Sequence, residues 1–160
     1  GRVDSVSHSY FDGEADGVET LEMPADGVFE DALPVILRGW NGAFVAEGES
    51  RTVPCLPSLL HARLTHTPLE WTTARISRAS ETESVSGPSG RFEVSMLTVD
   101  VEGGRTLTFA IEARPPYRVV RQTGPDGEEL ALLGSARLAY WKLNTPGAES
   151  YLEQIGLGGD

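Results

Sequence analysis

Residues 91–113 read RFEVSMLTVDV, EGG and RTLTFAIEA in succession, and this stretch decides the fold. Apolar and polar residues alternate along both longer runs, with the period of two that is typical of half-buried β-strands. Gly103 and Gly104 lie between the runs, and paired glycines at such a position are typical of a β-hairpin turn. We therefore predict two antiparallel strands joined by a tight turn.

The pattern of strands and turns continues on both sides of this hairpin. Before it, residues 69–85 alternate weakly and predict one long strand or two short ones, closed by the turn Ser86–Gly90. After it come Tyr117–Gln122, the turn Gly124–Gly127 and a last run from Glu128 to Leu143. We predict a mainly β fold of the α+β class, in which a curved antiparallel β-sheet forms a meander or half-barrel.

One face of the predicted sheet is apolar, and the opposite face carries mainly Glu, Ser and Thr. To the apolar face we assign Phe92, Val94, Met96, Leu107, Phe109, Ile111, Val119, Leu130 and Leu132. An apolar sheet face must be covered in a soluble domain. The cover that we expect is a helix from Glu30 to Asn41, with Asp31 as its N-cap and Leu33, Ile36, Leu37 and Trp40 in one stripe.

Three further segments complete the expected arrangement. A C-terminal helix is predicted from Pro146 to Ile155, with an apolar stripe that includes Tyr151 and Leu152. The segment from Leu59 to Thr65 is predicted to be extended. Pro54 lacks a backbone N–H, so we expect no central strand around it.

The length and net charge of the sequence indicate one acidic domain. The 160 residues suffice for a single domain with a real core, which we assign to residues 1–160. The formal net charge of -11 argues against binding to nucleic acid or anchoring on anionic lipid, because both need clustered Lys and Arg. No apolar run approaches membrane-spanning length. Since Gly1 and not Met begins the sequence, we also consider that it is the C-terminal part of a longer protein.

The sequence contains no motif for a catalytic residue, a metal or a cofactor, and we predict none. Cys55 is the only cysteine, which excludes an intrachain disulfide, and we interpret it as a packed thiol. His61 and His66 are five residues apart, a spacing that turns them to different sides of a strand or a helix. Phosphate loops, nucleophile elbows and dinucleotide fingerprints are absent from the sequence.

Aromatic residues and arginines are the remaining candidates for binding. Core packing is the simpler interpretation of the large aromatic residues, and a wall against an apolar ligand is the alternative. As ligand-binding candidates we name Trp40, Phe109, Tyr117, Tyr140 and Trp141. Arg114, Arg118 and Arg121 surround Tyr117 and are candidates for contact with an anion; pairing with Glu112 and Glu128 across neighbouring strands is the favoured alternative.

Several segments in this order resemble a family of bacterial exported proteins of unknown function. They are Leu21–Pro24, Glu30–Arg38, Ser86–Ser95, Gly103–Phe109 and Pro115–Val120. The family's fold is similar to the half-barrel of the LolA lipoprotein carriers, in which a curved antiparallel sheet wraps around helical segments. The resemblance implies a periplasmic or cell-envelope location, and it brings no catalytic residues with it.

These observations favour a non-enzymatic binding domain that holds an apolar or lipid-like ligand in the concave face of its sheet. The first alternative is a protein-interaction or structural module of a larger envelope or secreted assembly, because an open sheet has unpaired edges. The second alternative is an enzyme that uses a carboxylate in a cleft or His61.

Overall fold

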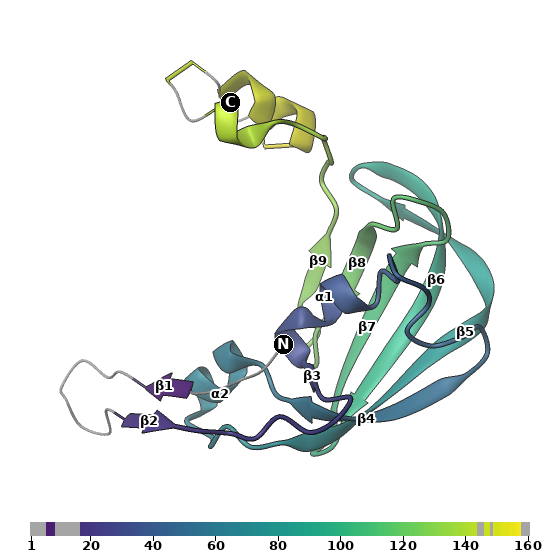
Figure 1. Ribbon diagram of the computed structural model, residues 1–160. Helices are drawn as coiled ribbons and strands as arrows, with labels where there is room; N and C mark the ends of the chain where they lie inside the picture. The colour runs from purple at the N-terminus through teal and green to yellow at the C-terminus, as the bar shows by residue number, and fades with distance from the viewer. Residues whose placement is uncertain (1–5, 9–16, 144–145, 148, 158–160) are drawn as a thin grey trace.

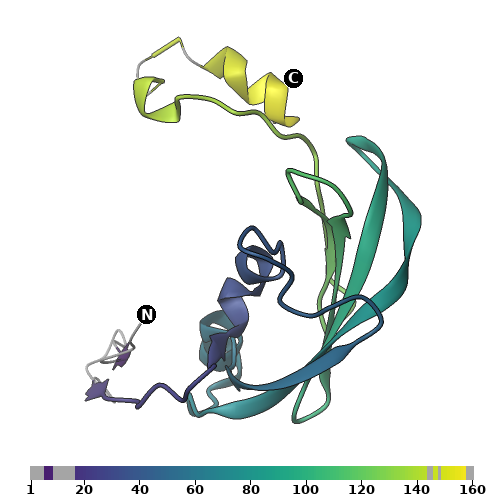
Figure 2. The same cartoon turned by 45° about the vertical axis from the view of Figure 1, so that its right-hand side comes forward.

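A curled sheet of seven strands dominates the computed structural model, which describes residues 6–8, 17–143, 146–147 and 149–157. The strands follow one another in chain order: β3 (Val28–Phe29), β4 (Ser50–Leu56), β5 (Thr72–Gly87), β6 (Gly90–Val101), β7 (Arg105–Glu112), β8 (Val119–Thr123) and β9 (Glu129–Ala131). All neighbours are antiparallel except β3 and β4. Figures 1 and 2 show the resulting half-barrel, and the predicted mainly β fold is confirmed.

Short elements complete the chain. A two-stranded ribbon of β1 (Val6–His8) and β2 (Gly17–Glu19) precedes the sheet. The helical segments are η1 (Glu30–Ala32), α1 (Leu33–Ile36), α2 (Leu59–Thr65), η2 (Tyr140–Lys142) and η3 (Glu149–Ile155), where η denotes a 3-10 helix. In the described residues, no helix is long and apolar enough to cross a membrane.

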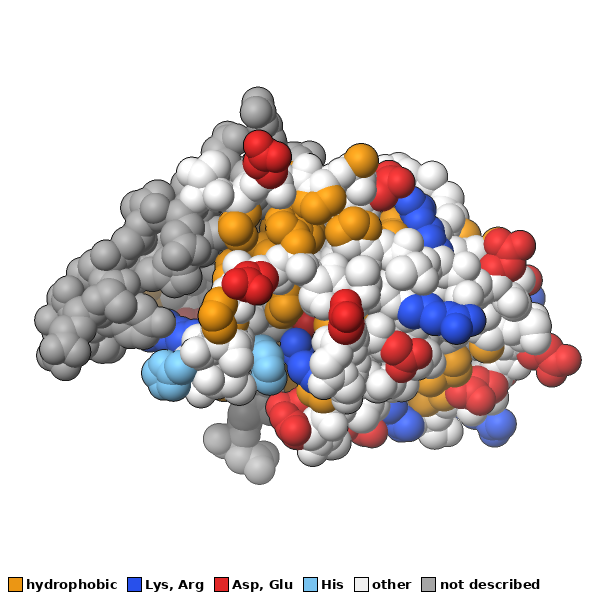
Figure 3. Space-filling model, turned by 90° about the horizontal axis from the view of Figure 1, so that it is seen from below, with side chains coloured by type: hydrophobic (Ala, Val, Ile, Leu, Met, Phe, Trp, Pro, Cys, Tyr) orange, Lys and Arg blue, Asp and Glu red, His pale blue; other side chains and the backbone are white. Residues whose placement is uncertain are grey.

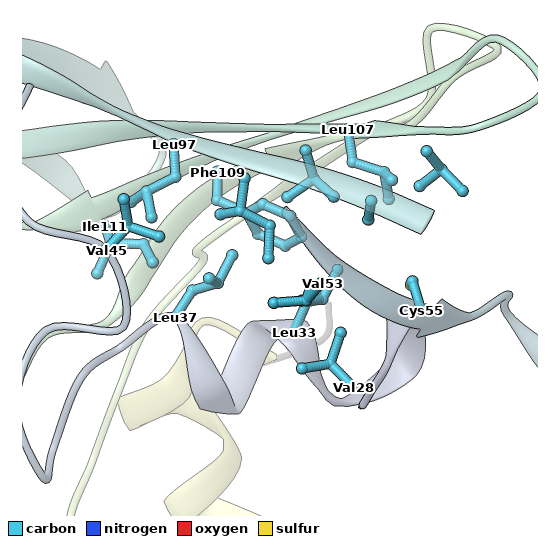
Figure 4. Packing of buried hydrophobic residues seen from close by; sticks show 14 residues of the cluster. Val28, Leu33, Leu37, Val45, Val53, Cys55, Leu97, Leu107, Phe109 and Ile111 are labelled. Atoms are coloured by element: carbon cyan, nitrogen blue, oxygen red, sulfur yellow. The ribbon is translucent and has the colours of Figure 1, made fainter. Parts of the chain in front are cut away.

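The main core lies between the concave face of the sheet and α1 (Figure 4). Leu33 and Leu37 point from the helical segment toward Phe109 and Val53 of the sheet, and all four side chains are buried. Burial of a side chain of this size stabilises a fold by about 1.5–3 kcal/mol. The predicted packing of a short helix on the sheet is therefore observed, and it occupies the middle of the concave face.

The prediction of which residues share the apolar face was wrong for β6. Val101 pairs with Arg105 across a three-residue loop, and this register sets Leu97 opposite Phe109 and Met96 opposite Ala110. Odd-numbered residues of β6 therefore face the core with Phe109, while Phe92, Val94 and Met96 face outward. The sequence interpretation had assigned even-numbered residues of β6 and odd-numbered residues of β7 to the same face. With a three-residue loop, odd-numbered residues pair with odd-numbered residues, so that assignment is not possible.

The outward apolar residues form a second, smaller cluster near the tip of the β5–β6 hairpin. Val94, Ala110 and Val120 are buried there. Ser89 at the tip donates a hydrogen bond to the carbonyl of Leu132 (2.7 Å), beyond the end of β9. The hairpin tip thus contacts the segment that follows β9, the last strand of the sheet.

The helix that was predicted from Glu30 to Asn41 ends at Ile36. Gly39 has a φ of +68°, which stops the α-helix, and Trp40 lies in the following loop instead of on the helical stripe. Asp31 is not an N-cap, because its carboxylate accepts a hydrogen bond from the backbone N–H of Leu59 (3.0 Å). A long-range contact has replaced the local one that the sequence suggested.

The C-terminal prediction also needs correction. Only Glu129–Ala131 of the last run is a strand, and the predicted helix begins at Glu149, after a turn at Pro146–Gly147, and is a 3-10 helix. Its apolar residues Tyr151 and Leu152 are exposed, since the segment does not pack on the sheet.

For the middle of the chain, the prediction of an extended segment at Leu59–Thr65 was wrong, and the prediction of no central strand at Pro54 is confirmed. Leu59–Thr65 is helical and not extended: Ser58 caps it by accepting from the N–H of His61, and His66 ends it with a φ of +54°. A strand does run through Pro54, but β3 pairs only with Cys55 and Leu56, so that β4 is an edge strand at Pro54. The missing N–H is tolerated for that reason.

An ion pair between Glu30 and Arg105 holds the helical segment on the sheet. The Glu30 side chain is only 4% exposed, and its second oxygen accepts a hydrogen bond from the N–H of Ser58 (3.3 Å). One carboxylate therefore joins η1, the start of β7 and the residue before α2. Removing one partner of a buried pair leaves an uncompensated charge, which costs about 3–5 kcal/mol.

Glu30→Gln is expected to lower the free energy of unfolding by about 3 kcal/mol, measured by urea denaturation. Asp31→Asn is the matched control, because the neighbouring carboxylate is exposed and accepts a single backbone hydrogen bond. We expect a loss of no more than about 1 kcal/mol for the control. Equal losses for the two variants would contradict the role assigned to Glu30.

Candidate functional site

A hollow of about 510 Å³ lies beside the end of α1 and is the candidate functional site. Its walls are polar and apolar in nearly equal parts, and Arg51 is their cation. They consist of Val35, Ile36, Gly39, Trp40, Asn41, Gly42, Ala43, Phe44 and Arg51. Ligand pockets in proteins typically enclose roughly 300–1,000 Å³ and have mainly apolar walls with a few polar groups. The volume of the hollow lies in this range, but the hollow is more open to solvent and more polar.

The sheet contributes Arg51 to the hollow. Arg51 pairs with Ile76 of β5, and Ile76 is fully buried on the concave face, so the register puts Arg51 on that same face. Because β3 pairs with β4 only at Cys55 and Leu56, no strand in the described part of the chain pairs with the outer edge of β4 at Arg51. The hollow therefore opens at an uncovered edge of the concave face.

The opposite wall is the loop after α1, which is anchored to the loop between β7 and β8. Arg38 donates hydrogen bonds to the carbonyls of Tyr117 (2.7 Å) and Pro116 (2.9 Å). The guanidinium of Arg38 also lies 4.2 Å from the centre of the Trp40 ring system, an attractive cation–π arrangement. The indole N–H of Trp40 donates to the Pro116 carbonyl (3.4 Å). These contacts hold the exposed indole at the rim.

Arg51 is the charged group of the hollow. Its guanidinium lies 4.8 Å from the centre of the Phe44 ring and 3.3 Å from the carboxylate of Asp26. The side chain is 41% exposed and that of Asp26 is 73% exposed, so water screens this ion pair. A ligand with an anionic group can therefore compete with Asp26 for Arg51.

The aromatic candidates from the sequence occupy different environments. Trp40 is 63% exposed and lines the hollow. Tyr117 is half-buried in the loop between β7 and β8, to which Arg38 is hydrogen-bonded. Phe109 is fully buried, where its ring packs the core. Tyr140 and Trp141 are exposed and stack edge-to-face on each other at 5.4 Å. They belong to η2, and Figures 1 and 2 show the chain after β9 standing away from the sheet. Of the five candidates, Trp40 alone lines the hollow.

The arginine candidates mainly form ion pairs. Arg118 donates two hydrogen bonds to the carboxylate of Glu112 (2.6 and 2.8 Å), as the favoured interpretation predicted. Arg121 pairs with Glu129 (3.5 Å) instead of Glu128, and it donates to the carbonyl of Ser86 (2.9 Å). Arg114 is exposed.

The side chains that could carry out chemistry are placed as follows. Cys55 is fully buried, and desolvation together with the nearby charge of Glu30 raises the pKa of its thiol to about 11. The thiol is therefore protonated at neutral pH, which suits the packed role expected from the sequence. His61 lies in α2 and His66 at its end. Across the described ranges, no three His, Cys, Asp or Glu side chains gather as metal ligands.

Sequence reasoning missed Val35, Ile36, Phe44 and Arg51 as wall residues. A signal for Arg51 was present, because it alternates with Val53 and Cys55 and so shares their apolar face. This signal was not used, because Pro54 had been taken as evidence against a central strand. Phe44 carried no comparable signal, since it follows a loop whose path is set by the distant carbonyls of Pro116 and Tyr117.

A scan against protein-family models, a search of curated proteins and a search of solved structures each found no match to this chain.

The Glu112–Arg118 pair predicts a pH-dependent part of the stability. Hydrogen bonds from Arg118 hold the pKa of Glu112 below its ordinary value of 4.5. A carboxyl group whose pKa is lowered on folding stabilises the protein above its unfolded pKa, and this contribution is lost as the pH falls through the folded pKa. We expect Glu112→Gln to lose about 1–2 kcal/mol at pH 7 and to differ less from the wild type as the pH is lowered.

Urea titrations between pH 7 and about pH 3 measure this effect. Glu93→Gln, at an exposed position of the adjacent β6, is the control, and we expect it to follow the wild type throughout. A difference between Glu112→Gln and the wild type that stays constant with pH would refute the prediction.

Proposed function

We propose that this protein is a non-enzymatic binding domain whose hollow takes a small ligand with an apolar body and an anionic group. The observation that carries the proposal is the combination of Trp40 and Phe44 with Arg51 around one hollow of about 510 Å³. Aromatic walls favour an apolar body through burial of surface, and a guanidinium favours a carboxylate or a similar anion. Fatty acids and aromatic acids are ligands of this class.

The position of the hollow refines the expectation of a ligand in the concave face. The middle of that face is filled by Leu33 and Leu37, which are buried against the sheet. A ligand would therefore bind at the uncovered edge beside β4, with its anionic group toward Arg51 and its apolar body along Val35 and Trp40. The resemblance to an exported bacterial family supports a carrier role of this kind in the cell envelope.

Fluorescent probes test the proposal. Anilinonaphthalene sulfonate has an apolar body and an anionic group, and N-phenylnaphthylamine has a similar body without charge. We expect saturable binding of both probes at one site. Trp40→Ala is expected to weaken both about tenfold, since it removes a wall that both contact. Arg51→Met is expected to weaken only the sulfonate.

Trp141→Ala is the matched control, because Trp141 is exposed to a similar degree as Trp40 but lies outside the hollow. We expect it to bind both probes as the wild type does. Binding that is not saturable, or that weakens equally in the Trp40 and Trp141 variants, would count decisively against the hollow as the site. Equal loss of both probes in Arg51→Met would refute the role of the anionic group.

A further inference from the structure

Asp26, the partner of Arg51, belongs to the turn that precedes β3. Its carboxylate lies 3.3 Å from Nη2 of Arg51. Asp26 does not belong to the wall residues of the hollow, so it reaches Arg51 from outside those walls. An anionic ligand would approach the same guanidinium from within the hollow.

An exposed ion pair is by itself an ordinary feature of this surface. Acidic side chains are scattered over the face of the molecule shown in Figure 3, and several lie beside basic ones. Such pairs contribute little to stability, because water screens the charges and the side chains lose freedom. The stability of the fold therefore gives little reason for a carboxylate at position 26.

Asp26 also has a backbone conformation that favours other residue types. The N–H of Gly27 donates to the carbonyl of Pro24 (3.1 Å), so that Asp26 is the third residue of a β-turn, and its φ is +61°. A positive φ at this position of a turn favours glycine or asparagine. Since either of these would suit the turn at least as well, the charge of Asp26 is the property that calls for a role.

The turn is held in place without Arg51. A Cβ atom at Gly27 would lie 3.1 Å from two carbons of the Trp71 ring, so the turn packs directly on that ring. Trp71 in turn packs against Phe29 of β3, with ring centres 5.9 Å apart. The Asp26 side chain can therefore leave Arg51 while the turn stays where it is, and the carboxylate remains nearby.

Arg51 likewise keeps a partner when Asp26 leaves. Its guanidinium lies 4.8 Å from the centre of the Phe44 ring, and Phe44 is a wall residue of the hollow. This cation–π contact holds the charge at the hollow. The planar fork of N–H groups on a guanidinium suits the two oxygens of a carboxylate or a sulfonate.

We propose that Asp26 is an intrachain competitor that sets the affinity of the hollow for anionic ligands. A ligand binds by replacing the Asp26 carboxylate on Arg51 with its own anionic group. This role rests on the proposed function and deepens it. Because the turn keeps the displaced carboxylate close to Arg51, Asp26 competes at a constant effective concentration and favours release of the ligand. A neutral ligand does not need the exchange.

Titrations of the full chain with anilinonaphthalene sulfonate and N-phenylnaphthylamine at low ionic strength test the proposal. Asp26→Asn removes the charge and suits the positive φ. We expect it to bind the sulfonate about threefold more tightly than the wild type, the effect of losing one exposed ion pair, and to bind the neutral probe equally well. Asp26→Gly is expected to show the same gain, and urea denaturation should show wild-type stability for both variants.

Asp126→Asn is the matched control for charge. Asp126 is exposed and also precedes a glycine in a turn, where the N–H of Gly127 donates to the carbonyl of Gly124 (3.2 Å). The substitution removes one negative charge from a turn outside the walls of the hollow. We expect wild-type affinity for both probes.

The double variant Arg51→Met/Asp26→Asn separates exchange on Arg51 from simple repulsion of the anion. We expect it to bind the sulfonate as Arg51→Met does, because Asp26 has no competing role without the guanidinium. A gain that persists in the Arg51→Met background would overturn the exchange. So would an unchanged sulfonate affinity in Asp26→Asn, or an equal gain in Asp126→Asn.

These results leave the hollow as a binding site, provided that Trp40→Ala still weakens both probes. Failure of the proposed function has a different result, namely the absence of saturable binding of either probe in the wild type and in every variant. That result would refute the exchange together with the site.

Discussion

The rest of the structure depends on the ion pair between Glu30 and Arg105. Arg105 begins β7 on the core face, opposite Val101, and Glu30 lies in the helical segment that covers this face. The carboxylate also accepts from the N–H of Ser58, which caps α2. A buried carboxylate needs such partners because its desolvation is costly. One side chain therefore sets the distance and orientation of three segments that are far apart in sequence, and α1 is held over the concave face as a consequence.

The position of α1 determines where a ligand can bind. Since Leu33 and Leu37 fill the middle of the half-barrel, the open part of the concave face is reduced to its edge at β4. Arg51 is available there because β3 is too short to cover it. The loop that completes the hollow is held by Arg38 on the carbonyls of Pro116 and Tyr117. The hollow thus results from two features of the fold: α1 is held over the middle of the concave face, and β3 is too short to pair with β4 at Arg51.

The sequence predicted more of the strands than of the segments around them. Alternation and glycine turns located the hairpin of β6 and β7 and the turn before β6, because side-chain period and turn geometry are local properties. The same reasoning failed for Phe92, Val94 and Met96, whose face depends on the parity of a three-residue loop. It failed for the helix that ends at Ile36, because Arg38 and Trp40 are held by carbonyls that are more than 70 residues away. Among the site candidates, Trp40 reached the hollow and Phe109 became core.

By itself, the sequence determined that the chain forms an antiparallel sheet with turns at its glycines, and that its charge is strongly negative. It also favoured an acidic partner for Arg118, through pairing across neighbouring strands, and Glu112 is that partner. Only the tertiary structure decided which residues of β6 face the core, where the helix ends and that Arg51 joins Phe44 and Trp40 in one hollow. The physical reason is that periodicity and turn preference depend on a few neighbouring residues and can be recognised in the sequence. Register, burial and the Glu30–Arg105 pair depend on contacts between segments that are far apart in sequence, and no local pattern indicates those contacts.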